Sequence, residues 1–345
     1  MKISKIIILI TLSIVLTSCF SLNYKIVTYI DRNGSGWREI QTATSKTDSL
    51  PELFPYNLSF GWKISQTDTI VKEYLSLKSK KNVKIRKEFN SFDDLSADLR
   101  NDIIFPIAKE SLKKRFRWFY TYYDFTAIYP EITEKGRVSL EEYLNKSEQK
   151  FYFQGDMSEY KGMNGVELKE KLDDIETRFW KWYNRSMYEE SFDVILYYSE
   201  SDFRPKLSAV KDSLYSILEK QNIEEPKVRD ICSALDKYFA TDIFAKLFNE
   251  NEHEMDSMLE ERLKIVESFL EYSIQYELTL PGKVVASNTD LQNGGTLKWN
   301  VNLFRFLSDD YILSAKSRKV NLWAFAVTLL LIVFSVFCFI RTSHT

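Results

Sequence analysis

The sequence predicts an α+β protein in which a mainly antiparallel β-sheet domain is interrupted by a helical insertion and followed by one C-terminal transmembrane helix. Strand-like alternation of apolar and polar residues dominates positions 22–132 and returns after position 273. Helical periodicity fills the stretch between them. An apolar run closes the chain, and a hydrophobic content of 44% is ample for a packed core and excludes general disorder.

These patterns divide the chain into six segments. Strands, then helices, then strands again favour one sheet domain with an interruption in its middle. The segments are a lipoprotein signal peptide (1–18), the first part of a β-rich ectodomain (19–137), a helical insertion (138–272), the last strands of the ectodomain (273–319), a transmembrane helix (320–340) and a cytoplasmic tail (341–345).

The first segment has the three parts of a secretory leader. Lys2 and Lys5 supply the charged region, residues 6–16 supply an apolar core too short to span a bilayer, and LTSC ends at Cys19. LTSC resembles the bacterial lipobox. The resemblance implies Cys19 as the mature first residue, with diacylglycerol on its sulfur and, in many bacteria, an acyl chain such as palmitate on its amine. The alternative is an ordinary leader with a chance cysteine.

The strand-rich stretch after the leader contains a candidate ligand surface. Its clearest strand is RFRWFYTYYDFTAIY at residues 115–129, which has aromatic residues on both faces, so we expect it to be covered on both sides. Trp118, Tyr120 and Tyr122 share one face and are suited to line a cavity for an acyl chain or a glycan. The same residues also fit an ordinary core, and both interpretations stay open.

The middle of the chain is expected to hold four or five helices. Apolar residues recur at alternating steps of four and three over residues 168–182 and 259–270. Pro205 and Pro226 stand where helices should start. Strand character then returns in SIQYELTLPGKVVASN and TLKWNVNLF, which we expect to pair with the strands before the helices, and a short linker should lead to the last helix.

The C-terminal run predicts a spanning helix. Residues 322–340 carry no charge and would extend about 28 Å as a helix, close to the thickness of a hydrocarbon core. Trp323 suits one interface and Arg341 ends the run at the other. Because a secretory leader directs the rest of the chain to export, we expect the ectodomain on the extracytoplasmic side of the inner or sole plasma membrane and the short tail in the cytoplasm.

Charge and composition limit the partners. Removing Lys2, Lys5 and Arg341 from the 47 basic residues leaves 44 against 49 acidic residues, a balance that argues against a nucleic-acid partner. Only Cys19, Cys232 and Cys338 could form disulfides, and Cys232 follows an apolar helical pattern that indicates a buried thiol. The membrane, a lipid or glycolipid ligand and an envelope protein are the expected partners.

The sequence offers little material for catalysis. Its two histidines are too few for a metal cluster or a histidine-based triad, and His253 lies among acidic residues that indicate a solvated helix start. We therefore predict no enzyme, metal site or cofactor. The alternative is an enzyme that modifies envelope glycans or lipids with carboxylates alone, which requires two carboxyl groups roughly 5–9.5 Å apart in a cleft.

A family resemblance also favours a non-enzymatic protein. LPGKVVASN at residues 280–288, then TLKW at residues 296–299 before a terminal apolar helix, together with the lipobox start, resemble the ends of LppM-like bacterial lipoproteins. The helical stretch departs from that pattern. The resemblance implies an α+β envelope domain with lipid or glycolipid contact and no catalytic residues. We therefore expect a membrane-anchored, non-enzymatic envelope lipoprotein that binds a lipid-like ligand or a protein partner.

Cys19→Ser should abolish lipid attachment and leader processing while the ectodomain still folds, because the thiol supplies chemistry and no packing. Metabolic labelling with a radioactive fatty acid measures the attachment. Undiminished label on the serine variant would refute the lipobox interpretation.

Overall fold

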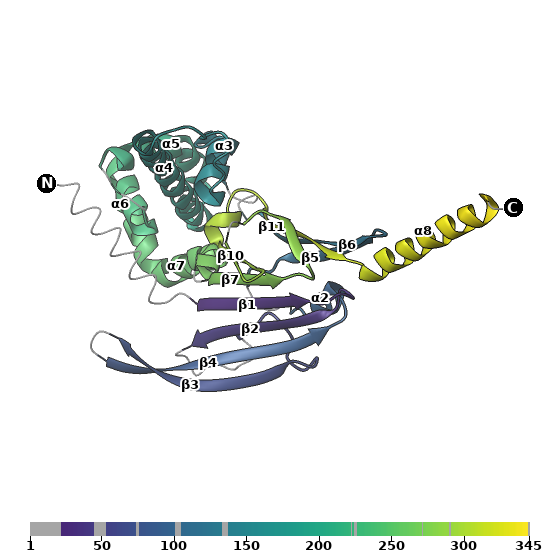
Figure 1. Ribbon diagram of the computed structural model, residues 1–345. Helices are drawn as coiled ribbons and strands as arrows, with labels where there is room; N and C mark the ends of the chain where they lie inside the picture. Colours follow the sequence, from purple (N-terminus) through teal and green to yellow (C-terminus); the bar gives the residue numbers. More distant parts are fainter. Residues whose placement is uncertain are drawn as a thin grey trace. The chain divides into compact units, whose positions relative to one another are not determined.

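The structure is a computed structural model that describes residues 22–44, 53–73, 76–100, 105–132, 137–221, 223, 226–270, 272–289 and 291–343 (Figure 1). The chain divides into two compact units. Residues 1–130, 269–303 and 311–345 belong to the first unit, and residues 131–268 with 304–310 belong to the second. Cys19 and the lipobox, which lie outside the described residues, are not placed. The predicted α+β class is confirmed.

The first unit contains a seven-stranded sheet and a four-stranded sheet. The larger one has the order β3-β4-β2-β1-β7-β10-β9. Its strands are β1 (Leu22–Ile30), β2 (Gly36–Thr44), β3 (Lys63–Glu73), β4 (Ser76–Phe89), β7 (Tyr272–Thr279), β9 (Gln292–Asn293) and β10 (Thr296–Asn302). The smaller sheet has the order β5-β6-β11-β8, with β5 (Lys109–Phe116), β6 (Tyr120–Tyr129), β8 (Lys283–Ser287) and β11 (Tyr311–Val320).

Both sheets join strands from the two sides of the helical stretch, as expected. β1 pairs in parallel with β7 from Leu22↔Tyr272 to Tyr29↔Thr279, and β6 pairs antiparallel with β11. The other pairs are antiparallel, including β1 with β2. The expected linker before the last helix is wrong, because residues 311–320 form β11 in the interior of the smaller sheet.

A tight turn sets the register of β1 and β2. In the turn DRNGSG, Gly34 has a φ of +96°, which L side chains rarely adopt. Gly36 pairs with Ile30 and lies so close to the opposite strand that a Cβ atom would stand 1.9 Å from the Tyr29 carbonyl oxygen. The stretch DRNGSG is thus the hairpin turn between β1 and β2.

The inner faces of the two sheets pack on each other through aromatic rings. The Phe125 ring of β6 stacks on the Tyr276 ring of β7, with 6.0 Å between centroids. Helix α2 (Phe92–Ala97) adds Phe92, whose ring lies 5.5 Å from that of Phe125. Ser91 caps this helix in a capping box with Asp94.

A buried ion pair crosses this core. Arg38 of β2 is 1% exposed and binds Glu110 of β5 through two hydrogen bonds of 2.6 and 2.7 Å. The remaining guanidinium hydrogens go to the hydroxyls of Thr28, Tyr56 and Tyr276. The Tyr276 hydroxyl in turn donates to Glu110 at 2.6 Å. The charge of Arg38 is therefore compensated by one carboxylate and three hydroxyls.

The second unit is helical. Its α-helices are α3 (Lys146–Gln149), α4 (Gly165–Tyr198), α5 (Arg204–Lys220), α6 (Val228–Phe239) and α7 (Ile243–Leu270), with short turns at η3 (Leu140–Glu142), η4 (Lys150–Gln154) and η5 (Leu303–Phe306). Pro205 lies in the first turn of α5, and α6 begins two residues after Pro226. Asn251 has a non-helical φ of −128° that breaks α7, so His253 stands at the start of the second helical part, and it is exposed, as predicted.

Two apolar clusters hold the helices together. One joins α4, α5, α6 and α7 and includes Cys232, which is 1% exposed. This low exposure confirms the prediction of a buried thiol, and burial raises the pKa of Cys232 to about 12. The other cluster packs Phe151 and Phe153 of η4 against Phe179 and Trp182 of α4.

An ion-pair cluster centred on Glu148 joins α3 to α4 beside the second apolar cluster. The Glu148 carboxylate accepts hydrogen bonds from Arg178 at 2.7 and 2.9 Å and from Lys171 at 2.6 Å. It also caps the start of α3 at Asn145. The bonds from Arg178 and then Lys171 outweigh burial and lower the pKa of Glu148 from 4.5 to about 2.

Glu110→Leu should destabilise the protein by about 3–5 kcal/mol, because it leaves the buried Arg38 charge unpaired. The double variant with Arg38→Met should recover most of this loss, since replacing both partners of a buried pair by apolar groups is often neutral. Guanidinium unfolding followed by tryptophan fluorescence measures both. As a control, Lys246→Met, in the exposed pair with Asp242, should cost less than about 1 kcal/mol. A double variant no more stable than Glu110→Leu would show that the unpaired charge of Arg38 is not the cause of the destabilisation.

Glu148 should make unfolding pH-dependent. Its pKa is lower in the folded protein, so its contribution is complete above about pH 4.5 and is lost as the pH falls toward 2. The loss should reach at most about 3 kcal/mol and be absent from Glu148→Gln. Unfolding curves between pH 6 and 2 measure it. Glu141→Gln, which removes an exposed partner of Lys146, serves as the control and should keep the pH dependence of the parent protein.

Candidate lipid-contact surface

The predicted aromatic strand is a hairpin. β5 ends at Phe116 and β6 begins at Tyr120, and the backbone groups of Arg117 and Tyr120 exchange hydrogen bonds of 2.7 and 3.1 Å across the turn. Trp118 and Phe119 form the two-residue loop. The expectation of one strand over residues 115–129 is therefore wrong at its first five residues, which bend back on the rest.

Only one face of this hairpin is covered. In β6, Tyr123, Phe125, Ala127 and Tyr129 are buried on the inner face, and the alternate residues are half-buried. The side chains of Phe116 and Trp118 are 60% and 44% exposed. The expectation of cover on both sides is wrong, because the second set of aromatics lies on the outer face of the smaller sheet and at the hairpin turn.

The three residues predicted to bind a ligand do not form one surface. Tyr120 and Tyr122 lie side by side on the outer face, with ring centroids 6.4 Å apart. Trp118 lies at the turn and faces the C-terminal helix, where its indole donates a hydrogen bond to the Thr328 hydroxyl at 2.9 Å. Ligand binding by these residues stays a prediction.

The outer face of the smaller sheet is strongly basic. Strand register places on it six cations and one carboxylate beside the two tyrosines. Asp124 is paired with Arg115 at 2.5 Å and Lys316 at 3.4 Å, and the Arg318 guanidinium lies 5.1 Å from the Tyr120 ring. We call this surface the basic face; it comprises Lys109, Lys113, Arg115, Tyr120, Tyr122, Asp124, Lys283, Lys316 and Arg318.

The basic face leads directly into an apolar helix. β11 ends at Val320, and α8 (Leu322–Ser343) begins two residues later. Within the described part of the chain, Leu322–Arg341 is the one helical stretch long and apolar enough to cross a membrane, with a mean hydropathy of 2.7. Its side chains are largely exposed, unlike those of a core helix. This helix is compatible with membrane association.

Aromatic rings join the hairpin turn to the start of α8. The Phe116 ring lies nearly parallel to the Trp323 ring at 6.2 Å, and the Trp118 ring meets Trp323 edge-on at 5.2 Å. The Phe119 ring lies 4.6 Å from that of Phe325. We call these five residues the aromatic tip. The sequence predicts Trp323 at a membrane interface. Its contacts with residues 116–119 are tertiary and could not be predicted from the local sequence.

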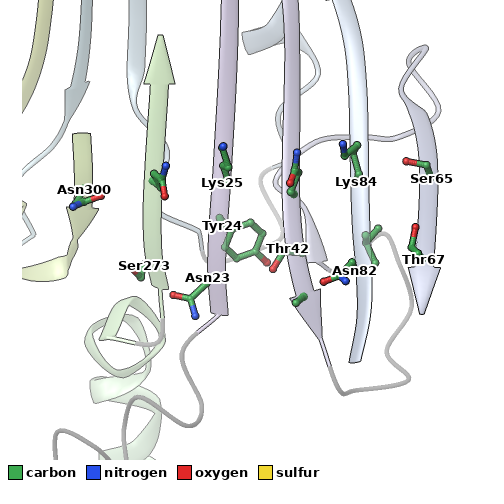
Figure 2. A pocket seen from close by; sticks show the side chains of 14 residues that line it. Asn23, Tyr24, Lys25, Thr42, Ser65, Thr67, Asn82, Lys84, Ser273 and Asn300 are labelled. Carbon is green, nitrogen blue, oxygen red and sulfur yellow. The ribbon is translucent and has the colours of Figure 1, made fainter. Parts of the chain in front are cut away.

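The outer face of the larger sheet forms a second candidate surface, an open polar groove of about 580 Å³ (Figure 2). Figure 2 shows Lys25 and Lys84 on separate strands, with Ser65 and Thr67 toward one edge and Asn300 toward the other. The lysines are paired with Glu277 and Glu39. Amide and hydroxyl side chains make up most of the lining, and none of the lining residues is a carboxylate.

The carboxyl groups with lowered pKa values accept hydrogen bonds in ion pairs, in helix caps or, as for Asp31 and Asp156, in turns. For example, a hydrogen bond from Arg185 lowers the pKa of Asp212, and Lys25 and Lys298 lower that of Glu277 against the effect of burial. A general acid needs the opposite shift. In the described part of the chain, no group of three or more His, Cys, Asp or Glu residues could hold a metal ion.

Comparison with known proteins adds one structural match. No protein-family model matches the chain, and no curated protein matches its sequence. The chain matches the NMR structure of the folded domain of Mycobacterium tuberculosis LppM at 8% identity and a TM-score of 0.28, over 87% of this chain and 91% of that chain. A TM-score this low does not define a common fold, so the resemblance to LppM-like lipoproteins remains a prediction from the sequence.

Proposed function

We propose that this protein is a non-enzymatic, membrane-anchored envelope lipoprotein whose basic face binds the headgroups of anionic lipids. The observation that carries the proposal is the continuity of the basic face with α8. Arg115 and Arg318 lie at the end of the sheet from which the apolar helix leaves. If α8 crosses a bilayer, these cations stand at the height of the headgroups.

The chemistry of the basic face fits phosphate esters in a lipid. Guanidinium groups bind phosphate oxygens through paired hydrogen bonds, and tyrosine rings suit the boundary between headgroups and acyl chains. Each cation close to an anionic membrane contributes about 1 kcal/mol of attraction. The single carboxylate, Asp124, is already occupied by Arg115 and Lys316 and repels little.

Anchoring at both ends agrees with this role. A lipid on Cys19 would attach the chain to a membrane a second time, ahead of β1, with the sheets on the extracytoplasmic side. The enzyme alternative has less support, because the polar groove lacks carboxylates in its lining and the pKa values of carboxyl groups such as Glu148 and Asp212 are lowered by neighbouring cations. A protein partner on the same face is the competing outcome.

Full-length protein from vesicles of equal phosphatidylcholine and phosphatidylglycerol should copurify with phosphatidylglycerol enriched several-fold, because the basic face selects the anionic headgroup. Mass spectrometry of the extracted lipid measures the ratio. The triple variant Arg115→Gln, Lys316→Gln and Arg318→Gln should return the ratio toward that of the vesicles, as should high salt.

A matched control removes three cations from the outer face of the larger sheet: Lys63→Gln, Lys84→Gln and Arg86→Gln. This variant loses the same charge and should keep the enrichment. Equal loss in both triple variants would show a dependence on net charge alone and contradict a specific role of the basic face. No enrichment in the parent protein would overturn the proposal.

A further inference from the structure

We infer that the β5–β6 hairpin turn is a second membrane-embedded element, inserted beside α8 into the outer layer of the bilayer. The inference rests on the proposed function in one respect, namely that α8 crosses the membrane. The turn is surrounded by the acyl chains of that membrane. Three independent features of the turn support it: depth, apolar exposure and the saturation of its carbonyl groups.

Depth follows from the contact with Thr328. This residue lies six positions after Leu322, where α8 begins, and a helix rises about 1.5 Å per residue. Thr328 is therefore about 9 Å along the helix axis from its start. The apolar run of α8 barely matches a hydrocarbon core of about 30 Å, so little of it can remain outside. The hydrogen bond from Trp118 to Thr328 then places the indole below the headgroups.

The rings of the turn are exposed as a lipid-facing patch would be. Phe116, Trp118 and Trp323 expose 60%, 44% and 52% of their surface, and the first two rings both contact Trp323. A contiguous exposed patch of large apolar side chains marks an interaction surface. Trp and Phe at this position, next to the first turns of α8, match the aromatic belt of membrane proteins.

The backbone carbonyl groups of the turn have hydrogen-bond donors within the protein and do not depend on water. Asn321 donates from its side-chain nitrogen to the carbonyls of Arg117 and Trp118 at 2.9 and 3.1 Å. Its backbone nitrogen donates to the Phe119 carbonyl at 2.9 Å, and Arg117 donates to the Tyr120 carbonyl at 2.7 Å. All four carbonyls of the turn thus have protein donors. A turn in water does not need this, whereas each unsatisfied carbonyl in hydrocarbon costs several kcal/mol.

The polar side chains at the same level are also satisfied. The Thr328 hydroxyl donates to the Ala324 carbonyl at 2.7 Å while it accepts from Trp118. The Asn321 side-chain oxygen accepts from the Thr121 hydroxyl at 3.0 Å. Arg117 is the one charged residue of the turn, and its long side chain can extend from the turn to the headgroups.

Quenching by brominated lipid tests the inference on full-length protein in nanodiscs. With bromine at carbons 6 and 7 of the acyl chains, Trp118→Phe should remove a share of the quenchable tryptophan fluorescence similar to that removed by Trp323→Phe. Trp37→Phe, whose ring stacks on Tyr29 in the larger sheet, should leave the quenchable fluorescence unchanged. Phe116→Trp should add quenchable fluorescence, so a gain of signal accompanies the losses.

The outcomes separate this inference from the proposed function. If Trp323→Phe reduces quenching but Trp118→Phe and Phe116→Trp do not change it, α8 enters the membrane without the hairpin and the inference fails alone. If neither Trp118→Phe nor Trp323→Phe reduces quenching, the membrane span itself is refuted. Asn321→Ala should lower the quenching of Trp118 in the Trp323→Phe background, with circular dichroism to check that the variant is folded.

Discussion

The ion pair between Arg38 and Glu110 is the constraint on which the first unit depends. Two charges removed from water are tolerated only when their geometry is good and their other hydrogen-bonding groups are satisfied. Here that requires Thr28, Tyr56 and Tyr276 as well. The pair therefore fixes how the two sheets face each other. A shift of β5 by one residue would turn Glu110 outward and leave the guanidinium alone in the core.

This constraint extends to the membrane end of the unit. No residue of β5 is fully buried, and only Glu110 and Leu112 are half-buried, so apolar packing alone would hold the strand weakly in register. Glu110 anchors the strand at its start. The hairpin turn lies at the other end of the strand, and Asn321 ties that turn to α8. The position of the helix is thus linked through one strand to a buried charge pair.

Much of the fold was predictable because its patterns are local. The hairpin of β1 and β2, the helix start at Ser91, the helical stretch and the apolar end all follow from periodicity and turn residues. β11 was missed because only one of its buried positions, Leu313, is a large apolar residue, whereas Ala315 and Ser317 are small and stand among cations that mask the alternation. The β5–β6 turn was missed because its residues Arg117, Trp118 and Phe119 include no Gly, Pro or Asn.

The candidate surface was predictable only in part. Trp118, Tyr120 and Tyr122 stand out as an aromatic run, but two of the six cations that complete the basic face come from β11, far along the chain. Their register with β6 is set by tertiary pairing and leaves no trace in the local sequence. The role of Asn321 is hidden for the same reason. The buried position of Arg38 could not be predicted for another reason. Alternation assigns charged residues to the solvent face of a strand, whereas Arg38 faces the core.

The parallel pairing of β1 with β7 has a consequence for how the protein acquires its shape. The two strands start at residues that lie 250 positions apart, from Leu22 to Tyr272. After synthesis of β2, one edge of β1 stays open while the entire helical unit is made. Closing such a distant pair is entropically costly and slow. The helical unit, with its own apolar clusters, can fold first and bring the ends of this loop together. The larger sheet is then completed last, when β7 pairs with β1. Until that step the open edge of β1 can pair with a strand of another chain, so strand exchange between nascent chains is most probable at this stage.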